Sequence, residues 1–203
     1  MTPQPARPMH AVFARRAPGR STLFTAVALL FCVSLALHAQ DEDAEVLSAA
    51  LRHYSNSKRN PLLVIAAETI ETGRISLGRF ERAEAPEIPV SIRRELHNRS
   101  LKARPIAGIQ LPANAMIVRE AISMTRHVTP GGAEVADWSP FTHAYPGYRL
   151  LQLSVPAYFT PGQKALVYFW AGIGPEGTQG WLYILEKRGS EWHVTWSDSP
   201  WIS

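Results

Sequence analysis

The C-terminal third of the chain has the most regular pattern of hydrophobic and polar positions. Four runs rich in β-branched and aromatic residues lie there, and glycine and proline separate them. The runs are Tyr148–Val155, Lys164–Ala171, Trp181–Arg188 and Glu191–Ser197. Runs of this kind, bounded by turn residues, are typical of consecutive antiparallel strands. The pattern therefore predicts a C-terminal β-meander over residues 148–203.

The Gly189-Ser190 step predicts the register of the last hairpin. Glycine supplies the positive φ that the first central position of a type II′ turn requires, and such a turn leaves Arg188 opposite Glu191. In that register one face carries Trp181, Tyr183, Leu185, Lys187, Trp192, Val194 and Trp196. The other face carries Glu186, His193, Thr195 and Ser197. One apolar and one mixed face predict a sheet that is covered on one side only.

The segments before the meander supply the cover. Apolar positions at helical spacing predict a helix over Ala44–Tyr54 and a shorter one over Val90–Asn98, which Pro89 opens. Leu62–Ala67 reads as a buried strand, and Ala115–Val128 fits either a strand or a short helix. We therefore expect one α+β domain with helices packed on one face of a curved antiparallel sheet. By analogy of architecture alone, a cystatin-like or nuclear-transport-factor-like arrangement is the nearest general match.

The N-terminal residues have the pattern of an export signal. Four arginines and no acid precede the apolar run Leu23–Leu37, and small Ala39 follows near the expected cleavage point. We predict a signal peptide over residues 1–39, a mature domain over 40–203, and a periplasmic or extracellular location. The alternative is an uncleaved N-terminal membrane anchor, because the run is near the minimum length for a spanning helix.

Removing this leader changes the charge of the chain. It carries four of the 21 Lys and Arg and none of the 17 Asp and Glu, so 17 basic and 17 acidic residues remain. A neutral mature chain without an evident basic stripe predicts no nucleic-acid partner, and a membrane partner only if the leader stays attached. Cys32, the single cysteine, lies in the leader. The mature chain is therefore expected to be free of disulfides.

Residues with catalytic or metal-binding chemistry are scattered. No two mature histidines have the i, i+4 spacing that places two imidazoles around zinc, and no cofactor motif occurs, so we expect neither metal nor cofactor. The best polar cluster combines Asp137, Ser139 and His143, which are the residue types of a nucleophile, a base and an acid. Capping of a helix by Asp137 and Ser139 explains the same residues without catalysis.

The six tryptophans all follow residue 137, and their concentration there is the most unusual feature of the composition. An aromatic-lined concavity on a curved sheet would bind a sugar, a peptide or an apolar ligand. Alternatively, a small domain without disulfides uses large rings to fill its core.

The C-terminal half also carries a succession of motifs. They are Trp138-Ser-Pro-Phe141, Tyr145-Pro-Gly147, Gln163-Lys-Ala-Leu-Val-Tyr168, Leu185-Glu-Lys-Arg188, Trp192, Val194 and Trp201-Ile-Ser203. In these residues the chain resembles a group of exported bacterial proteins of unknown function. The resemblance implies a shared small α+β fold and no particular activity.

Three classes of function remain open from the sequence. The first is a non-enzymatic binding or interaction module of the bacterial envelope or medium, whose partner is a protein or a small apolar or sugar ligand. The second is a small secreted hydrolase or acid–base enzyme that uses His143 with Asp137 or with an acid that is distant in sequence. The third is a structural accessory subunit that docks through a sheet edge or exposed aromatic residues.

Overall fold

The computed structural model describes residues 41–70, 88–119, 125–128, 134–160, 162–172, 174 and 177–202. All of them belong to one compact unit, Gln40–Ser203. The predicted signal peptide over residues 1–39 lies outside the described residues. Within the described part, none of the helices has the length and apolar character needed to cross a membrane.

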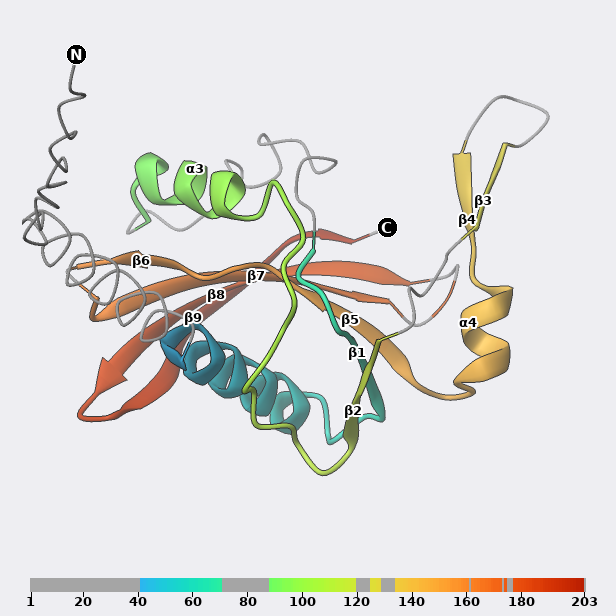
Figure 1. Ribbon diagram of the computed structural model, residues 1–203, viewed down its shortest axis with the longest axis horizontal. Coiled ribbons are helices and arrows are strands. Elements are labelled where there is room, and N and C mark those ends of the chain that lie inside the picture. Colours follow the sequence, from blue (N-terminus) through green and yellow to red (C-terminus); the bar gives the residue numbers. More distant parts are fainter. Residues whose placement is uncertain are drawn as a thin grey trace, which may run out of the picture. The chain divides into compact units, whose positions relative to one another are not determined.

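A seven-stranded open sheet forms the centre of this unit (Figure 1). Its strands are β1 (Leu63–Ala66), β2 (Ala115–Val118), β5 (Arg149–Leu153), β6 (Ala157–Phe159), β7 (Lys164–Gly172), β8 (Thr178–Arg188) and β9 (Glu191–Ile202). They follow the order β2-β1-β5-β7-β8-β9, and β6 also pairs with β7. Strand β1 is parallel to both of its neighbours, and the other pairs are antiparallel. The predicted α+β class and the C-terminal meander of β7, β8 and β9 are confirmed.

A separate two-stranded hairpin precedes β5. It consists of β3 (Thr125–Val128) and β4 (Glu134–Asp137), which pair in antiparallel fashion. The segment that fitted either a strand or a short helix therefore contributes β2 and β3. The predicted strand Leu62–Ala67 forms β1, and the predicted helix that begins at Val90 forms α3 (Val90–Arg99).

Helices cover both faces of the large sheet, so the prediction that they pack on one face is wrong (Figure 1). A helix over residues 41–57 packs on one face, where its Leu47, Leu51 and Tyr54 join the largest apolar cluster. On the opposite face α3 contributes Leu96, and the short α4 (Ser139–Ala144) contributes Phe141. The reason is that the central strands carry apolar side chains on both faces of the sheet, and each face needs a cover.

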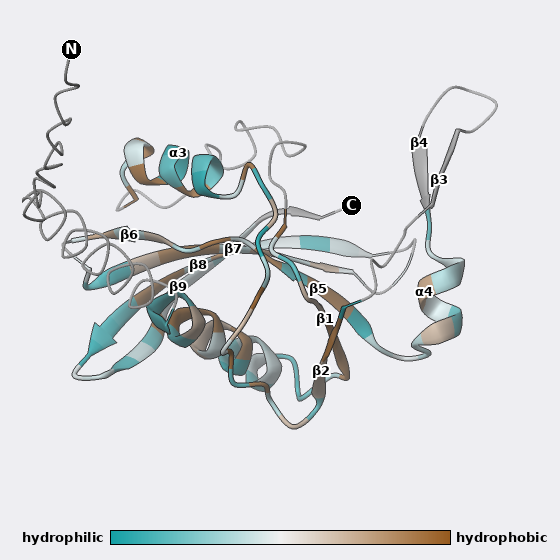
Figure 2. Cartoon of the chain, in the orientation of Figure 1, coloured by the Kyte–Doolittle hydropathy of each residue, from teal (hydrophilic) through white to brown (hydrophobic). Residues whose placement is uncertain are grey.

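Strand β7 shows this two-sided burial most clearly. Ala165, Val167 and Phe169 belong to the cluster under helix 41–57, while Leu166 and Tyr168 belong to the cluster under α3. A continuous apolar run is the pattern of a strand that is buried on both faces. Figure 2 shows the corresponding apolar colouring along β1, β2 and β7.

The hairpin of β8 and β9 begins in the predicted register and then departs from it. Gly189 has a φ of +64°, and Arg188 pairs with Glu191 as expected. Between the pairs Leu185 with Val194 and Ile184 with Trp196, however, β9 contains one extra residue, Thr195. Such a β-bulge reverses the faces of the residues that follow it, here up to a second register shift between Asp198 and Trp201. Trp196 therefore packs in the cluster under α3 and not beside Trp192 and Val194, which corrects the predicted face.

A tryptophan and a glycine form one close contact at the end of β7. Trp138 is buried, lies parallel to Trp170 with ring centroids 5.5 Å apart, and meets Phe141 edge-on. Gly172 leaves the space for its indole, because a Cβ at this position would come within 2.9 Å of Trp138 Cζ2. Glycine at residue 172 is therefore required by packing, since its φ is not positive.

Two buried serines complete the hydrogen bonds where β5 passes into β6. Ser154 Oγ accepts the backbone N–H of Tyr168 at 3.0 Å, and Ser100 Oγ accepts that of Val155 at 3.1 Å. Both serines are fully buried, so water cannot replace these acceptors. The short irregular segment between the strands is thus held to β7 and to the end of α3.

Replacing Gly172 with alanine is expected to destabilise the fold by about 1–3 kcal/mol, because the added methyl group overlaps the Trp138 ring. Chemical denaturation of the wild type and the variant measures this difference. In a Trp138→Phe background, where the overlapping ring atoms are gone, the same substitution should cost less. An equal cost in both backgrounds would contradict the contact.

Replacing Ser154 or Ser100 with alanine is expected to cost about 1–3 kcal/mol each, because a buried N–H loses its acceptor. Denaturation midpoints give the comparison, and Ser91→Ala is the matched control because Ser91 is exposed on α3. A surface substitution usually changes the free energy of unfolding by less than about 0.5 kcal/mol. If the Ser154 and Ser100 variants differed from the control by no more than this, the two hydrogen bonds would not be needed for stability.

Candidate functional site

The three predicted catalytic residues lie around the start and end of α4. Asp137 Oδ1 accepts the backbone N–H of Ser139 at 2.9 Å, which satisfies a donor of the first turn. His143 is exposed in the last turn. Among the described residues, no hydrogen bond joins His143 to Asp137 or to Ser139. The carboxylate therefore acts at the helix start and does not orient the imidazole.

The tryptophans are divided between the two faces of the sheet. Trp181 and Trp192 pack in the cluster under helix 41–57, Trp196 packs under α3, and Trp138 packs under α4. Residues on opposite faces cannot line a single concavity. The arrangement matches the alternative in which large rings fill the core, while the side chain of Trp201 lies outside the described part.

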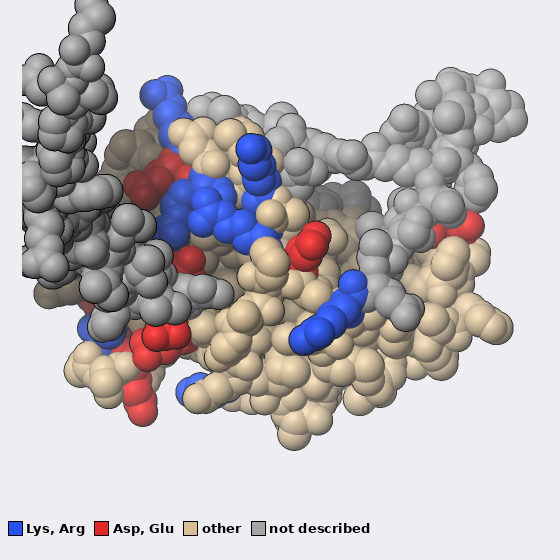
Figure 3. Space-filling model, in the orientation of Figure 1, with Lys and Arg blue, Asp and Glu red and all other residues tan. Residues whose placement is uncertain are grey.

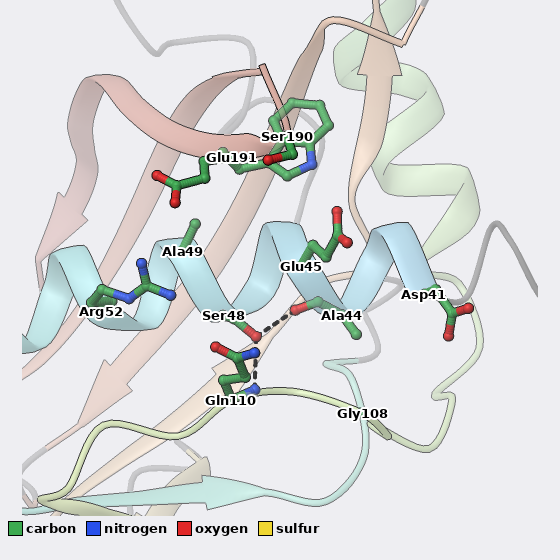
Figure 4. A pocket seen from close by; sticks show the side chains of 11 residues that line it. Asp41, Ala44, Glu45, Ser48, Ala49, Arg52, Gly108, Gln110, Ser190 and Glu191 are labelled. Carbon is green, nitrogen blue, oxygen red and sulfur yellow. Dashed lines mark hydrogen bonds between the residues drawn. The ribbon is translucent and has the colours of Figure 1, made fainter. Parts of the chain in front are cut away.

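A polar groove of about 520 Å³ lies on the side of helix 41–57. Three segments that are distant in sequence enclose it: the helix, residues 108–110 and the turn between β8 and β9 (Figure 4). The lining residues are Asp41, Ala44, Glu45, Ser48, Ala49, Arg52, Gly108, Gln110, Ser190, Glu191 and Trp192. Its volume lies in the range of small-molecule sites.

The helix presents one stripe to this groove. Its lining residues are spaced by three or four positions, so they share a helical face. Ser48 Oγ donates to the carbonyl of Ala44 at 2.6 Å and accepts the backbone N–H of Gln110 at 2.8 Å (Figure 4). Gly108 has a φ of +73° and would bring an added Cβ to 3.4 Å from Ala44 Cβ. The hydroxyl of Ser48 thereby fixes the loop against the helix.

Trp192 forms the wall on the sheet side. It is only 5% exposed, its ring centroid lies 6.1 Å from that of Tyr158, and Lys187 Nζ lies 5.5 Å from the ring. Its Nε1 has no hydrogen-bond partner among the described residues. Because its neighbours already hold the Trp192 side chain in place, ligand binding would not cost side-chain conformational entropy at this wall.

The groove has an excess of negative charge. The carboxylates of Asp41, Glu45 and Glu191 are exposed along it, and Arg52 is the one basic side chain in its lining. Figure 4 shows Glu45 and Arg52 on the helix and Glu191 on the opposite turn. Like charges that lie around one cavity favour a ligand of the opposite sign.

A second polar network lies next to the groove at the start of the helix. Tyr158 donates its hydroxyl to Asp43 Oδ1 at 2.7 Å, and Arg99 approaches Asp43 Oδ2 at 3.4 Å. Lys187 Nζ forms an ion pair with Glu42 at 3.0 Å. These contacts join the first turn of the helix to β6, to β8 and to the end of α3.

Burial dominates the ionisation of this network. The pKa of Asp43 is raised because desolvation disfavours its charged form, although the Tyr158 hydroxyl and the Arg99 charge oppose the shift. The pKa of Tyr158 is also raised, by burial and by the neighbouring Asp43 charge. Tyr158 therefore stays protonated and acts as a hydrogen-bond donor.

The groove lining contains charged and polar side chains that can contact a ligand, but it does not contain an evident set of catalytic groups. In the part of the chain that the structure describes, no three His, Cys, Asp or Glu side chains lie close enough to hold a metal ion. Of the two serines in the lining, Ser48 already donates its hydroxyl to a carbonyl and Ser190 lies in the exposed turn, and no histidine lines the cavity. The lining thus lacks the pair of an activated nucleophile and an oriented base.

No family model, curated protein or solved structure matches this chain. The cystatin-like or nuclear-transport-factor-like architecture and the resemblance to exported bacterial proteins therefore stay predictions.

Only part of the groove has a signal in the sequence. The sequence predicts a helix over Ala44–Tyr54, and the spacing of Glu45 and Arg52 places these two charges on one side of it, whereas Asp41 precedes the predicted helix. The other walls come from residues 108–110, which carry only a loop signal, and from residues 190–192, which the sequence predicts as the end of a turn and the start of a strand. Their approach to the helix depends on the tertiary fold.

The wild type should lose stability relative to Asp43→Asn as the pH rises from below 3.8 to neutrality. The folded pKa is raised above the unfolded value, so the stability that protonation contributes is present at low pH and is lost as the pH rises through the folded pKa. Asparagine keeps an acceptor for Tyr158 and does not titrate. Urea denaturation across this pH range measures the difference.

Asp41→Asn is the control for this comparison, because Asp41 is exposed and forms none of the contacts described for Asp43. A wild type that gained stability over Asp43→Asn with rising pH would show that the Arg99 pair outweighs the cost of burial.

Proposed function

We propose that the chain is a non-enzymatic binding module of the bacterial envelope or medium, and that the groove beside helix 41–57 is its ligand site. The acidic lining of a cavity with fixed walls is the observation that carries this proposal. The basic and apolar N-terminal pattern that ends near Ala39 supports export.

The ligand is a small molecule with a positively charged amine. Glu45 on the helix and Glu191 on the opposite turn both line the groove, so a cationic ligand meets negative charge from both walls. One such contact at about 4 Å is worth roughly 1–4 kcal/mol for effective dielectric constants between 80 and 20. The polar lining does not favour the purely apolar ligand that the sequence left open.

A binding role is favoured over hydrolysis by the state of Ser48. Its hydroxyl is held by two hydrogen bonds, one to Ala44 and one from Gln110. A nucleophile would need a base to accept that proton, and the lining supplies none within a triad-like arrangement. The same two bonds support a rigid wall, which lowers the ordering cost of binding.

Thermal unfolding with small amines tests this function. Putrescine and lysine methyl ester are expected to raise the melting temperature of the full chain by a few degrees at concentrations well above their Kd. Glucose and glutamate, which carry no net positive charge, should have little effect. Isothermal calorimetry gives the affinity of any probe that stabilises the protein.

Substitutions then assign the effect to the groove. Glu45→Gln combined with Glu191→Gln should remove the stabilisation by the amines, whereas Glu95→Gln should keep it because Glu95 is exposed on α3. If both amines left the melting temperature unchanged, or if the double variant responded like the wild type, the proposed site would be wrong.

A further inference from the structure

Basic residues gather on one element of a domain that is neutral overall. Residues 90–105 carry five Lys and Arg and a single acid, Glu95. The five are Arg93, Arg94, Arg99, Lys102 and Arg104. Residues 40–203 have equal numbers of basic and acidic side chains, so the remainder of the domain is net negative.

This charge is accessible at α3 and at the segment that follows it. Figure 3 shows Lys and Arg side chains together over this part of the molecule. Arg94, Lys102 and Arg104 are exposed, whereas Arg99 is half-buried against Asp43 and Arg93 is buried. Three cations are therefore open to a partner.

Exposed apolar side chains accompany them. Val90 at the start of α3 is 52% exposed, and Leu101 just after its end is 44% exposed. Val90 and Arg94 are four positions apart, which places them on the same face of the helix. We call Val90, Arg94, Leu101, Lys102 and Arg104 the α3 surface.

We propose that the α3 surface binds an anionic phospholipid bilayer. Basic side chains beside exposed aliphatic ones suit a lipid interface, where the charges meet headgroups and the apolar tips enter the acyl boundary. Single-stranded nucleic acid would instead require stacking platforms, and residues 90–105 contain no aromatic side chain apart from His97. The lipid surface is thus the partner that this chemistry fits.

A fluorescent label on the α3 surface tests the proposal with the full chain. Leu101→Cys in a Cys32→Ser background accepts an environment-sensitive dye, and Asn56→Cys provides a label on the exposed side of helix 41–57. With phosphatidylglycerol vesicles, the dye at residue 101 should shift to shorter wavelength while the dye at residue 56 does not. Phosphatidylcholine vesicles should produce no shift at residue 101.

Charge variants measure the contribution of the basic residues. Each Lys or Arg near an anionic surface contributes about fivefold to partitioning, so Arg94→Gln with Lys102→Gln should require about 25-fold more lipid. Lys164→Gln with Arg188→Gln removes the same charge elsewhere and should change partitioning little. Unchanged melting temperatures show that all variants are folded.

Several results would overturn the proposal. A dye at residue 101 that stays in water, an equal response to both lipids, or an equal loss in the two charge variants would each exclude specific binding by the α3 surface. A response to duplex DNA at lower concentration than to vesicles would assign the surface to nucleic acid.

Discussion

Burial of β7 on both of its faces is the constraint on which the rest of the structure depends. Five consecutive side chains, Ala165–Phe169, are almost completely removed from solvent. A strand can bury both faces only if it is central in the sheet and has a layer on each side. Strands β5 and β8 complete its hydrogen bonds, and helix 41–57 and α3 provide the layers. The positions of the groove and of the α3 surface follow from those layers.

Local sequence signals predicted the elements but not their faces. Glycine at residue 189 gave the hairpin and the pair of Arg188 with Glu191, because a turn with positive φ is a local requirement. Thr195 gave no comparable signal, since a bulge depends on pairing with β8 and no residue type is unique to it. Once the bulge was missed, Trp196 was assigned to the wrong face. The parallel pairing of β1 likewise joins segments that are distant in sequence.

The groove was less predictable than the fold for the same reason. Ser48 and Gln110 are 62 residues apart, and the turn at Glu191 lies much further along the chain. The spacing of apolar residues predicts the helix that forms one wall, while the other walls depend on tertiary packing. The neighbours Asp137, Ser139 and His143 were instead grouped because they are close in sequence. In the structure Trp138 is the N-cap residue of α4, and Asp137 just before it accepts the N–H of Ser139, which satisfies a donor of the first turn.

The start of helix 41–57 and the end of α3 meet at the Asp43–Arg99 pair. The acid lies in the first turn of helix 41–57 and the base in the last turn of α3, which are the ends that the helix dipoles favour for each charge. Desolvation raises the pKa of Asp43, so the pair does more to fix the helix ends than to add stability.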